Sequence, residues 1–164
     1  MKLRYGDLIR VLDEYFSLKA KGEIISPKNI AAGMLDLKYQ IDAVKQGLGI
    51  IRKHNGVIIA DVVGLGKSII TSAITYNLKM KAVIIAPPHL CDQWLDYSYD
   101  FDLTAKIYSS GSIEQALEED DGEEKIIIVD EAHKYRNENT EDYGNLHKLC
   151  QGKKVILLTA TPFN

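Results

Sequence analysis

A glycine-rich segment follows the apolar run GVIIA (56–60) and leads into a helical pattern. Its members are Gly64, Leu65, Gly66, Lys67 and Ser68. Glycines let backbone N–H groups curl around an anion, and the positive end of the following helix strengthens that attraction. In such a loop Lys67 would reach the β and γ phosphates of a nucleotide, and the Ser68 hydroxyl would hold Mg²⁺. The segment therefore predicts a phosphate-binding loop, with a glycine turn capped by serine as the alternative.

A pair of acids ends a second apolar run, IIIVDEAH (126–133). A carboxylate at this place, here Asp130, can hold Mg²⁺, while its neighbour Glu131 polarises an attacking water. An acidic strand-to-helix cap is the alternative for the pair taken alone. That alternative loses weight because the same chain already offers a phosphate-binding loop, so the two motifs together predict a nucleotide site with Mg²⁺.

Strand-like and helix-like segments alternate from residue 56 onward, and this order must position the two motifs. The expected strands lie at 56–61, 81–88, 105–110, 124–131 and 153–161, with helices near 68–78, 89–97, 112–119 and 140–150. Several strands are apolar without alternation, which is typical of strands buried on both faces. The succession predicts an α/β fold with a mainly parallel sheet between helices. Ligands bind such sheets at the carboxyl ends of the strands, where both motifs fall.

The remaining composition restricts the class of protein. A chain of 164 residues suits one domain, and two amphipathic helices are expected before the sheet, over the first twenty residues and at about 40–54. The net charge of −3 excludes a globally basic nucleic-acid binder, so any such surface must be local. Cys91 and Cys150 are too few for a disulfide framework and favour a reducing compartment. Because no apolar run could span a bilayer and no signal peptide is recognisable, we expect a cytoplasmic protein without a membrane partner.

In their order along the chain, the motifs resemble the first motor lobe of superfamily 2 helicases and translocases. DVVGLGKS (61–68) carries Asp61 where other phosphate loops have a first glycine, and this superfamily commonly has Ala or Asp there. LKYQIDAV (37–44) resembles the adenine-contacting glutamine motif, and LLTATPFN (157–164) resembles the motif that couples ATP hydrolysis to movement. APPHLCDQW (86–94) and the Gly-Leu-Gly of the loop resemble the Swi/Snf-related branch. Four departures from that branch are Val62, Val63, Ser68 and Ala160.

The resemblance implies a RecA-like three-layer α/β/α sandwich over residues 37–164, preceded by a helical lead-in over residues 1–36. Gln40 is expected to read the adenine edge with its amide, the alternative being an exposed helix glutamine. Glu131 is expected to act as general base or to orient water, with Lys67 as its catalytic partner. The expected ATP-binding residues are Gln40, Gly64, Leu65, Gly66, Lys67 and Ser68, and the expected Mg²⁺ ligands are Ser68 and Asp130.

Two further groups of residues concern movement and nucleic acid. The residues expected to couple the nucleotide site to movement are His133, Thr159 and Thr161. The residues expected to contact backbone phosphates of DNA are Pro87, Pro88 and His89. Trp94 is assigned mainly to packing, and the acidic stretch 118–124 to a solvated loop.

The expected function is that of an ATP-binding first lobe of a nucleic-acid-dependent ATPase that translocates on duplex DNA. A second RecA-like lobe, which supplies arginine fingers in this superfamily, would be its partner, and it is absent from a chain that stops at TATPFN (159–164). The isolated lobe is therefore expected to bind nucleotide with Mg²⁺ and to hydrolyse ATP poorly. Two alternatives are an ATPase that regulates protein partners without nucleic acid, and a nucleotide-binding module with structural use only.

Overall fold

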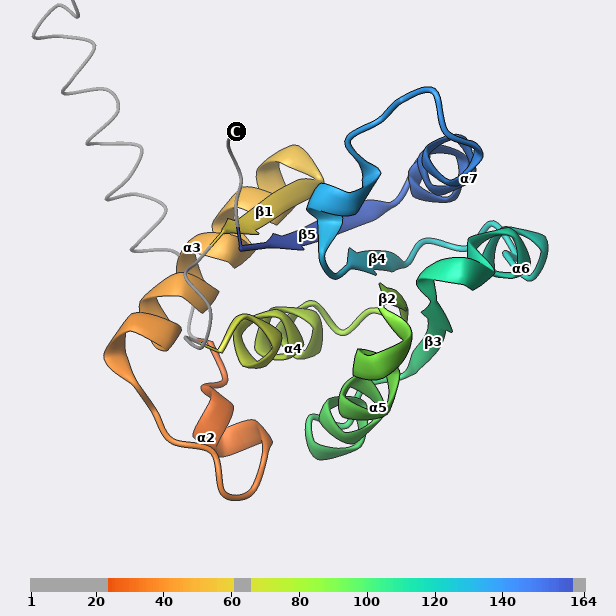
Figure 1. The fold of residues 1–164 in the computed structure, drawn as a ribbon. Helices are drawn as coiled ribbons and strands as arrows, with labels where there is room; N and C mark the ends of the chain where they lie inside the picture. Colours follow the sequence, from red (N-terminus) through yellow and green to blue (C-terminus); the bar gives the residue numbers. More distant parts are fainter. Residues whose placement is uncertain (1–23, 61–65, 161–164) are drawn as a thin grey trace, which may run out of the picture.

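The computed structural model describes residues 24–60 and 66–160 of the 164-residue chain (Figure 1). Five strands form one sheet: β1 (Gly56–Ala60), β2 (Ala82–Ala86), β3 (Ala105–Ser109), β4 (Ile126–Val129) and β5 (Lys154–Thr159). Their order across the sheet is β1-β5-β4-β2-β3, and every neighbouring pair is parallel. The α/β class and the parallel sheet predicted from the sequence are therefore confirmed.

The two central strands explain why the sheet needs a helical layer on each side. Every residue of β2 and β4 is buried. Side chains of a strand point alternately to opposite faces, so Ile84 and Ile128 pack in one core while Ile85 and Ile127 pack in another. The two cores lie on opposite faces of the same sheet.

Helices supply the outer layers (Figure 1). One face carries α3 (Lys38–His54), α4 (Lys67–Leu78) and α5 (Cys91–Asp100), whose apolar side chains join the first core. The other face carries α6 (Ile113–Glu118) and α7 (Glu141–Cys150). Each of these five helices lies within about three residues of its expected position. In the described part of the chain, no helix is both long and apolar enough to cross a membrane.

Residues 24–36 pack against the C-terminal end of α4. The short helix α2 (Pro27–Ile30) lies in this segment, and the Asn77 side chain bonds the backbone N–H and C=O of Ile25 at 2.8 and 2.9 Å. The Ser26 hydroxyl donates to Asp36 at 2.8 Å and closes the loop after α2. These residues are thus joined to the body of the domain, whereas the helix expected over the first twenty residues lies outside the described residues.

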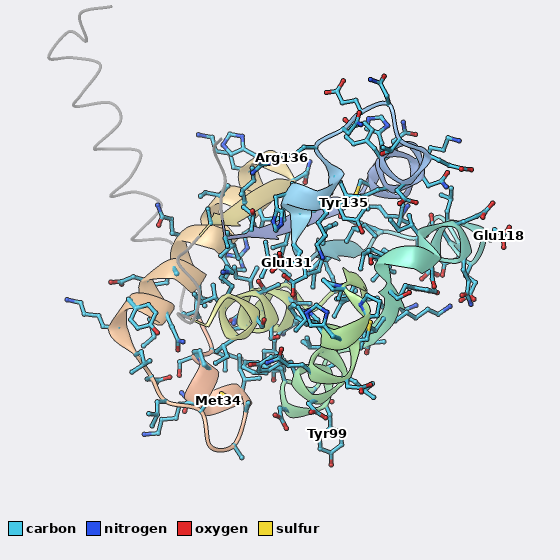
Figure 2. All side chains as sticks on the ribbon, viewed as in Figure 1. Met34, Tyr99, Glu118, Glu131, Tyr135 and Arg136 are labelled. Atoms are coloured by element: carbon cyan, nitrogen blue, oxygen red, sulfur yellow. The ribbon has the colours of Figure 1, made fainter. Side chains whose placement is uncertain are left out.

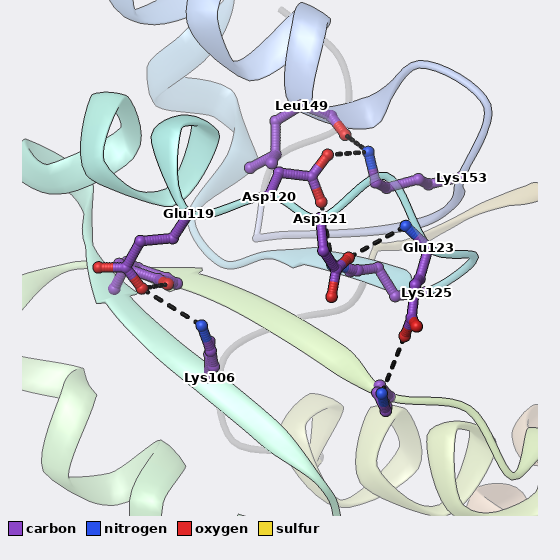
Figure 3. Close-up of polar contacts among 10 residues, drawn as sticks. Lys106, Glu119, Asp120, Asp121, Glu123, Lys125, Leu149 and Lys153 are labelled. Atoms are coloured by element: carbon purple, nitrogen blue, oxygen red, sulfur yellow. Dashed lines mark hydrogen bonds and ion pairs between the residues drawn. The ribbon is translucent and has the colours of Figure 1, made fainter.

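Ion pairs hold the acidic stretch 118–124 against the amino ends of the strands (Figure 3). The Lys153 ammonium donates to Asp120 Oδ2 at 2.7 Å, and Lys125 donates to Asp120 Oδ1 at 2.9 Å and to Asp121. The Lys125 and Asp120 side chains are only 9% and 13% exposed. Burial alone would raise the pKa of Asp120, but the bonds from Lys153 and Lys125 outweigh it and lower that pKa. The interpretation of this stretch as a solvated loop is wrong for Asp120, because the nearby Lys125 and the more distant Lys153 both bond to its half-buried carboxylate.

A second contact fixes the start of the same stretch. The Tyr108 hydroxyl donates to Glu119 at 2.7 Å, and Gln115 and Lys106 donate to the same carboxylate. These three bonds, that of Tyr108 foremost, lower the pKa of Glu119 to about 2. Burial and the same bond raise the pKa of Tyr108 to about 12, so this contact links β3 to the end of α6 over a wide pH range.

Candidate functional site

Four strand ends place the predicted site residues along one edge of the sheet. Ala60, the last residue of β1, pairs with Thr159, the last residue of β5. On the next strand, Val129 ends β4 opposite Leu157. The backbone N–H of Asp130 donates to the Ile85 carbonyl of β2 at 2.9 Å, which continues the ladder one residue further. The carboxyl ends of these strands therefore lie side by side at one edge of the sheet, the edge at which ligands bind such folds.

The phosphate-loop motif ends at the N-terminus of α4. Gly66 has φ +83°, a conformation that favours glycine, and it is the N-cap of the helix that Lys67 and Ser68 begin. The first turn of α4 contains no acidic residue, so the helix itself adds no negative charge at the positive end of its dipole. Backbone N–H groups at such a terminus suit a phosphate. Gly64 and Leu65, the other predicted loop residues, lie outside the described residues.

Gln40 lies against this loop. Gln40 is only 4% exposed. A Cβ built on Gly66 would lie only 2.5 Å from the Gln40 Nε2 atom. The alternative of an exposed helix glutamine is therefore wrong. Its expected role in reading adenine stays a prediction, and the structure adds that the amide sits at the end of the phosphate loop.

The acidic motif follows β4 with an ordered carboxylate and a strained backbone. Asp130 Oδ1 accepts the backbone N–H of Glu131 at 2.8 Å. Glu131 itself has φ +54° and ψ +41°, a left-handed conformation that costs a non-glycine residue about 1–2 kcal/mol. It leads into the short 3₁₀ helix η3 (Ala132–Tyr135), and Figure 2 shows it near the middle of the molecule. This conformation occurs at active sites and also at helix ends, where Asn55 and Lys79 adopt it, so Glu131 is singled out by its place beside Asp130.

His133 bridges the acidic motif and the end of β5. Its Nε2 lies 3.3 Å from Glu131 Oε2, and its Nδ1 lies 3.5 Å from Thr159 Oγ1. Two of the three residues expected to couple the site to movement, His133 and Thr159, are thus brought together. The third, Thr161, lies outside the described residues.

Trp94 is the site residue whose polar contact the sequence did not reveal. It is buried as expected, but its indole Nε1 also donates to Asp130 Oδ2 at 2.9 Å. A buried tryptophan usually finds a partner for its N–H group, which is the one signal that pointed to such a bond. The acid could not be identified, because Trp94 and Asp130 are 36 residues apart.

The segment expected to contact DNA follows β2 at the same edge. Pro88 and His89 are exposed and lie in the 3₁₀ helix η1 (Pro88–Leu90), whereas the side chain of Pro87 is buried. The prediction therefore depends on Pro88 and His89. Cys91 begins α5 directly afterwards, and burial raises the pKa of its thiol, which disfavours a thiolate nucleophile here.

The donor set fits a magnesium nucleotide. Ser68 and Asp130 offer a hydroxyl and a carboxylate, the oxygen ligands that Mg²⁺ takes. Gly66 lies in a backbone position that a Cβ would crowd, directly before Lys67 and the N-terminus of α4. Asp130 can still bind a cation, since each carboxylate oxygen has two acceptor sites and the bonds from Trp94 and Glu131 use one on each.

Comparison with known proteins supports the same assignment. Residues 101–164 match the family model described as "Type III restriction enzyme, res subunit". The chain is 29% identical to "Uncharacterized ATP-dependent helicase YqhH" of Bacillus subtilis, over 77% of this chain and 26% of that protein. It is 30% identical to "Putative ATP-dependent RNA helicase L538" of Acanthamoeba polyphaga mimivirus, over 72% of this chain and 28% of that protein. The chain thus spans about a quarter of the length of these curated relatives.

A solved structure matches the fold. The "Sulfolobus solfataricus SWI2/SNF2 ATPase core in complex with dsDNA" superposes with a TM-score of 0.71 at 22% identity, over 86% of this chain and 35% of that one. This likeness confirms the RecA-like α/β fold. The family model and the helicase relatives support a superfamily 2 helicase-type lobe, and the solved structure, a SWI2/SNF2 ATPase core, supports its fold.

Proposed function

We propose that the chain is the ATP-binding first motor lobe of a nucleic-acid-dependent ATPase that translocates on double-stranded DNA. The observation that carries the proposal is the gathering of three motifs at one sheet edge. Lys67 begins α4 after β1, Asp130 and Glu131 follow β4, and His133 contacts Thr159 at the end of β5. A structural nucleotide-binding module has no need of an acid that is linked through His133 to the end of a second strand.

The chemistry assigned to the chain's own residues follows from this arrangement. Lys67 and the N-terminus of α4 bind the β and γ phosphates of ATP. Mg²⁺, held by Ser68 and Asp130, neutralises charge on those phosphates when it is bound. Glu131 orients the attacking water and accepts its proton, which is mainly a matter of positioning in phosphoryl transfer.

We assign to His133 the coupling between ATP hydrolysis and movement. Because it contacts both Glu131 and Thr159, a change at the Glu131 carboxylate alters the contacts at the end of β5. We assign to a second RecA-like lobe the arginine fingers that complete catalysis, since the relatives are about four times as long as the matched region. Exposed Pro88 and His89 are the expected contacts to the DNA backbone. The two free thiols favour a cytoplasmic location.

ATPase activity of the intact protein, measured without nucleic acid, with duplex DNA and with RNA, tests the proposal. We expect duplex DNA to stimulate turnover, and Lys67→Ala or Glu131→Gln to lower it by about 100-fold or more. Turnover that no nucleic acid changes would instead favour regulation of protein partners. Full activity in both variants would leave only a structural use of nucleotide.

The 164-residue chain alone provides a second test. It is expected to bind ADP or ATP with Mg²⁺ and to turn over slowly, because a RecA-like lobe without arginine fingers lacks groups that stabilise the transition state. Robust hydrolysis by the isolated chain, further raised by DNA, would contradict the single-lobe account.

A further inference from the structure

Asp130, the carboxylate that we assign to Mg²⁺, is held on both oxygens by the protein. Oδ1 accepts the backbone N–H of Glu131 at 2.8 Å, and Oδ2 accepts the indole N–H of Trp94 at 2.9 Å. Two donors on opposite oxygens fix the rotation of the carboxylate about its Cβ–Cγ bond. Its orientation is therefore set before any cation binds.

The donor on Oδ2 is itself immobilised. Trp94 is 1% exposed, and its ring meets Tyr97 edge to face, with centroids 6.0 Å apart and planes at 67°. The Trp94 carbonyl accepts the Ser98 hydroxyl at 2.8 Å within α5. A buried indole can only donate, so it cannot compete with the carboxylate for a cation.

Trp94 also joins two parts of the sheet edge. It belongs to α5, which directly follows η1 and packs beneath β2, whereas Asp130 follows β4 (Figure 1). The segment expected to meet DNA and the indole thus lie in one continuous helical stretch. The bond gives the buried indole N–H an acceptor, and the acceptor that it finds is the one acid of this motif that we assign to the metal.

We propose that Trp94 is a positioning residue for the magnesium carboxylate, and that its indole reports whether Asp130 holds a cation. The inference rests on the proposed function, because it takes Asp130 as a Mg²⁺ ligand. Groups that orient a metal ligand without touching the metal typically change metal affinity about 10- to 100-fold when removed. Trp94→Phe keeps an aromatic ring in the core and removes the only donor to Oδ2 that the structure shows.

The test compares ADP binding by the 164-residue chain in EDTA and in Mg²⁺, measured by calorimetry. In the wild type, Mg²⁺ should tighten ADP binding, and in Trp94→Phe that gain should shrink by about tenfold while binding in EDTA is unchanged. Tyr97→Phe, which alters the ring beside Trp94 without touching Asp130, is the matched control and should keep the full gain. A purely structural role for Trp94 would weaken binding equally with and without Mg²⁺.

Fluorescence gives a readout that needs no Trp94 variant, since Trp94 is the only tryptophan in the chain. Adding Mg²⁺ to the ADP-bound wild type should change the indole emission, and Asp130→Asn should abolish that change while it still binds ADP in EDTA. An emission that does not respond to Mg²⁺, although calorimetry shows Mg²⁺-dependent ADP binding, would overturn the inference and leave the proposed function intact. Wild-type protein that bound no nucleotide at all would overturn both.

Discussion

The side-chain amide of Gln40 occupies the space that a side chain on Gly66 would need. A Cβ on Gly66 would lie 2.5 Å from Gln40 Nε2, and the glycine has φ +83°. The first turn of α3 and the start of α4 are therefore in contact at the end of the phosphate loop. The backbone conformation favours glycine at this position, and any larger side chain would also require the Gln40 amide to move.

Gly66→Ala is predicted to weaken nucleotide binding by at least about tenfold. The methyl group would displace Gln40, and the left-handed backbone would cost about 1–2 kcal/mol in addition. The dissociation constant for ADP with Mg²⁺, measured by calorimetry, checks this expectation. Unchanged affinity in a folded Gly66→Ala protein would show that this contact does not shape the site.

Gly152 offers a matched control for the backbone strain. It has φ +72°, and nothing lies within 4 Å of a Cβ built on it. Gly152→Ala should therefore lower the melting temperature as a strained alanine does, yet leave ADP affinity unchanged. The double variant Gln40→Ala/Gly66→Ala should recover part of the stability lost in Gly66→Ala, because truncating Gln40 makes room for the methyl group.

Thr159→Val is predicted to uncouple hydrolysis from movement in the intact protein. Valine keeps the shape of the buried side chain but removes the Oγ1 that lies 3.5 Å from His133 Nδ1. We expect ATPase activity to stay within a few-fold of the wild type and the rate of translocation on duplex DNA to fall by about tenfold or more. A tenfold fall corresponds to the loss of an interaction of about 1.4 kcal/mol, which is within the range of one hydrogen bond. Thr104→Val, at an exposed position before β3, should alter neither activity. Normal translocation by Thr159→Val would remove this contact from the mechanism.

The elements and motifs could be predicted because their signals are local. The runs of β2 and β4 are apolar at every position, which only a sheet covered on both faces satisfies. Gly66 precedes Lys67 and Ser68 in the order that a phosphate-binding helix start requires. These features lie within a few residues of each other, so the sequence displays them directly.

Contacts between distant segments could not be predicted in the same way. Trp94 and Asp130 are 36 residues apart, and Asp120 and Lys153 are 33 apart. Which partner a buried indole or ammonium finds depends on the register of β2, β4 and β5 and on the packing of α5. No short pattern encodes that register, so the acidic stretch by itself predicts a solvated loop and gives no sign that Asp120 is half-buried.

Ser72→Ala is predicted to stabilise the domain by about 0.5–1 kcal/mol. The Ser72 hydroxyl is fully buried in α4 and has no hydrogen-bond partner in the described structure, and alanine is the better helix former. Ser98→Ala is the contrasting variant, because it gains the same helix propensity but loses the bond to the Trp94 carbonyl at 2.8 Å, and it should therefore stabilise less than Ser72→Ala. Urea unfolding of both variants measures the difference. Destabilisation by Ser72→Ala would mean that its hydroxyl has a partner in solution.

Asp120→Asn is predicted to destabilise the domain by about 3 kcal/mol at pH 7. The substitution leaves the ammonium groups of Lys125 and Lys153, whose side chains are 9% and 7% exposed, without their shared carboxylate. Glu123→Gln removes a carboxylate from the same loop, but its partner Lys81 is 60% exposed. That variant should change the free energy of unfolding by less than about 0.5 kcal/mol.

The pH dependence of the stability of the wild type and of Asp120→Asn gives an independent check on the role of Asp120. Its pKa is lowered in the folded state, because the bonds from Lys153 and Lys125 outweigh the effect of burial. The stabilisation is therefore fully present above the unfolded pKa of about 3.9 and is lost as the pH falls through the lower folded pKa. Urea midpoints of the wild type and Asp120→Asn should accordingly differ at pH 7 and converge in strong acid. A difference that persists undiminished at a pH well below 3 would show that loss of shape or hydrogen bonding, rather than of charge, causes the destabilisation.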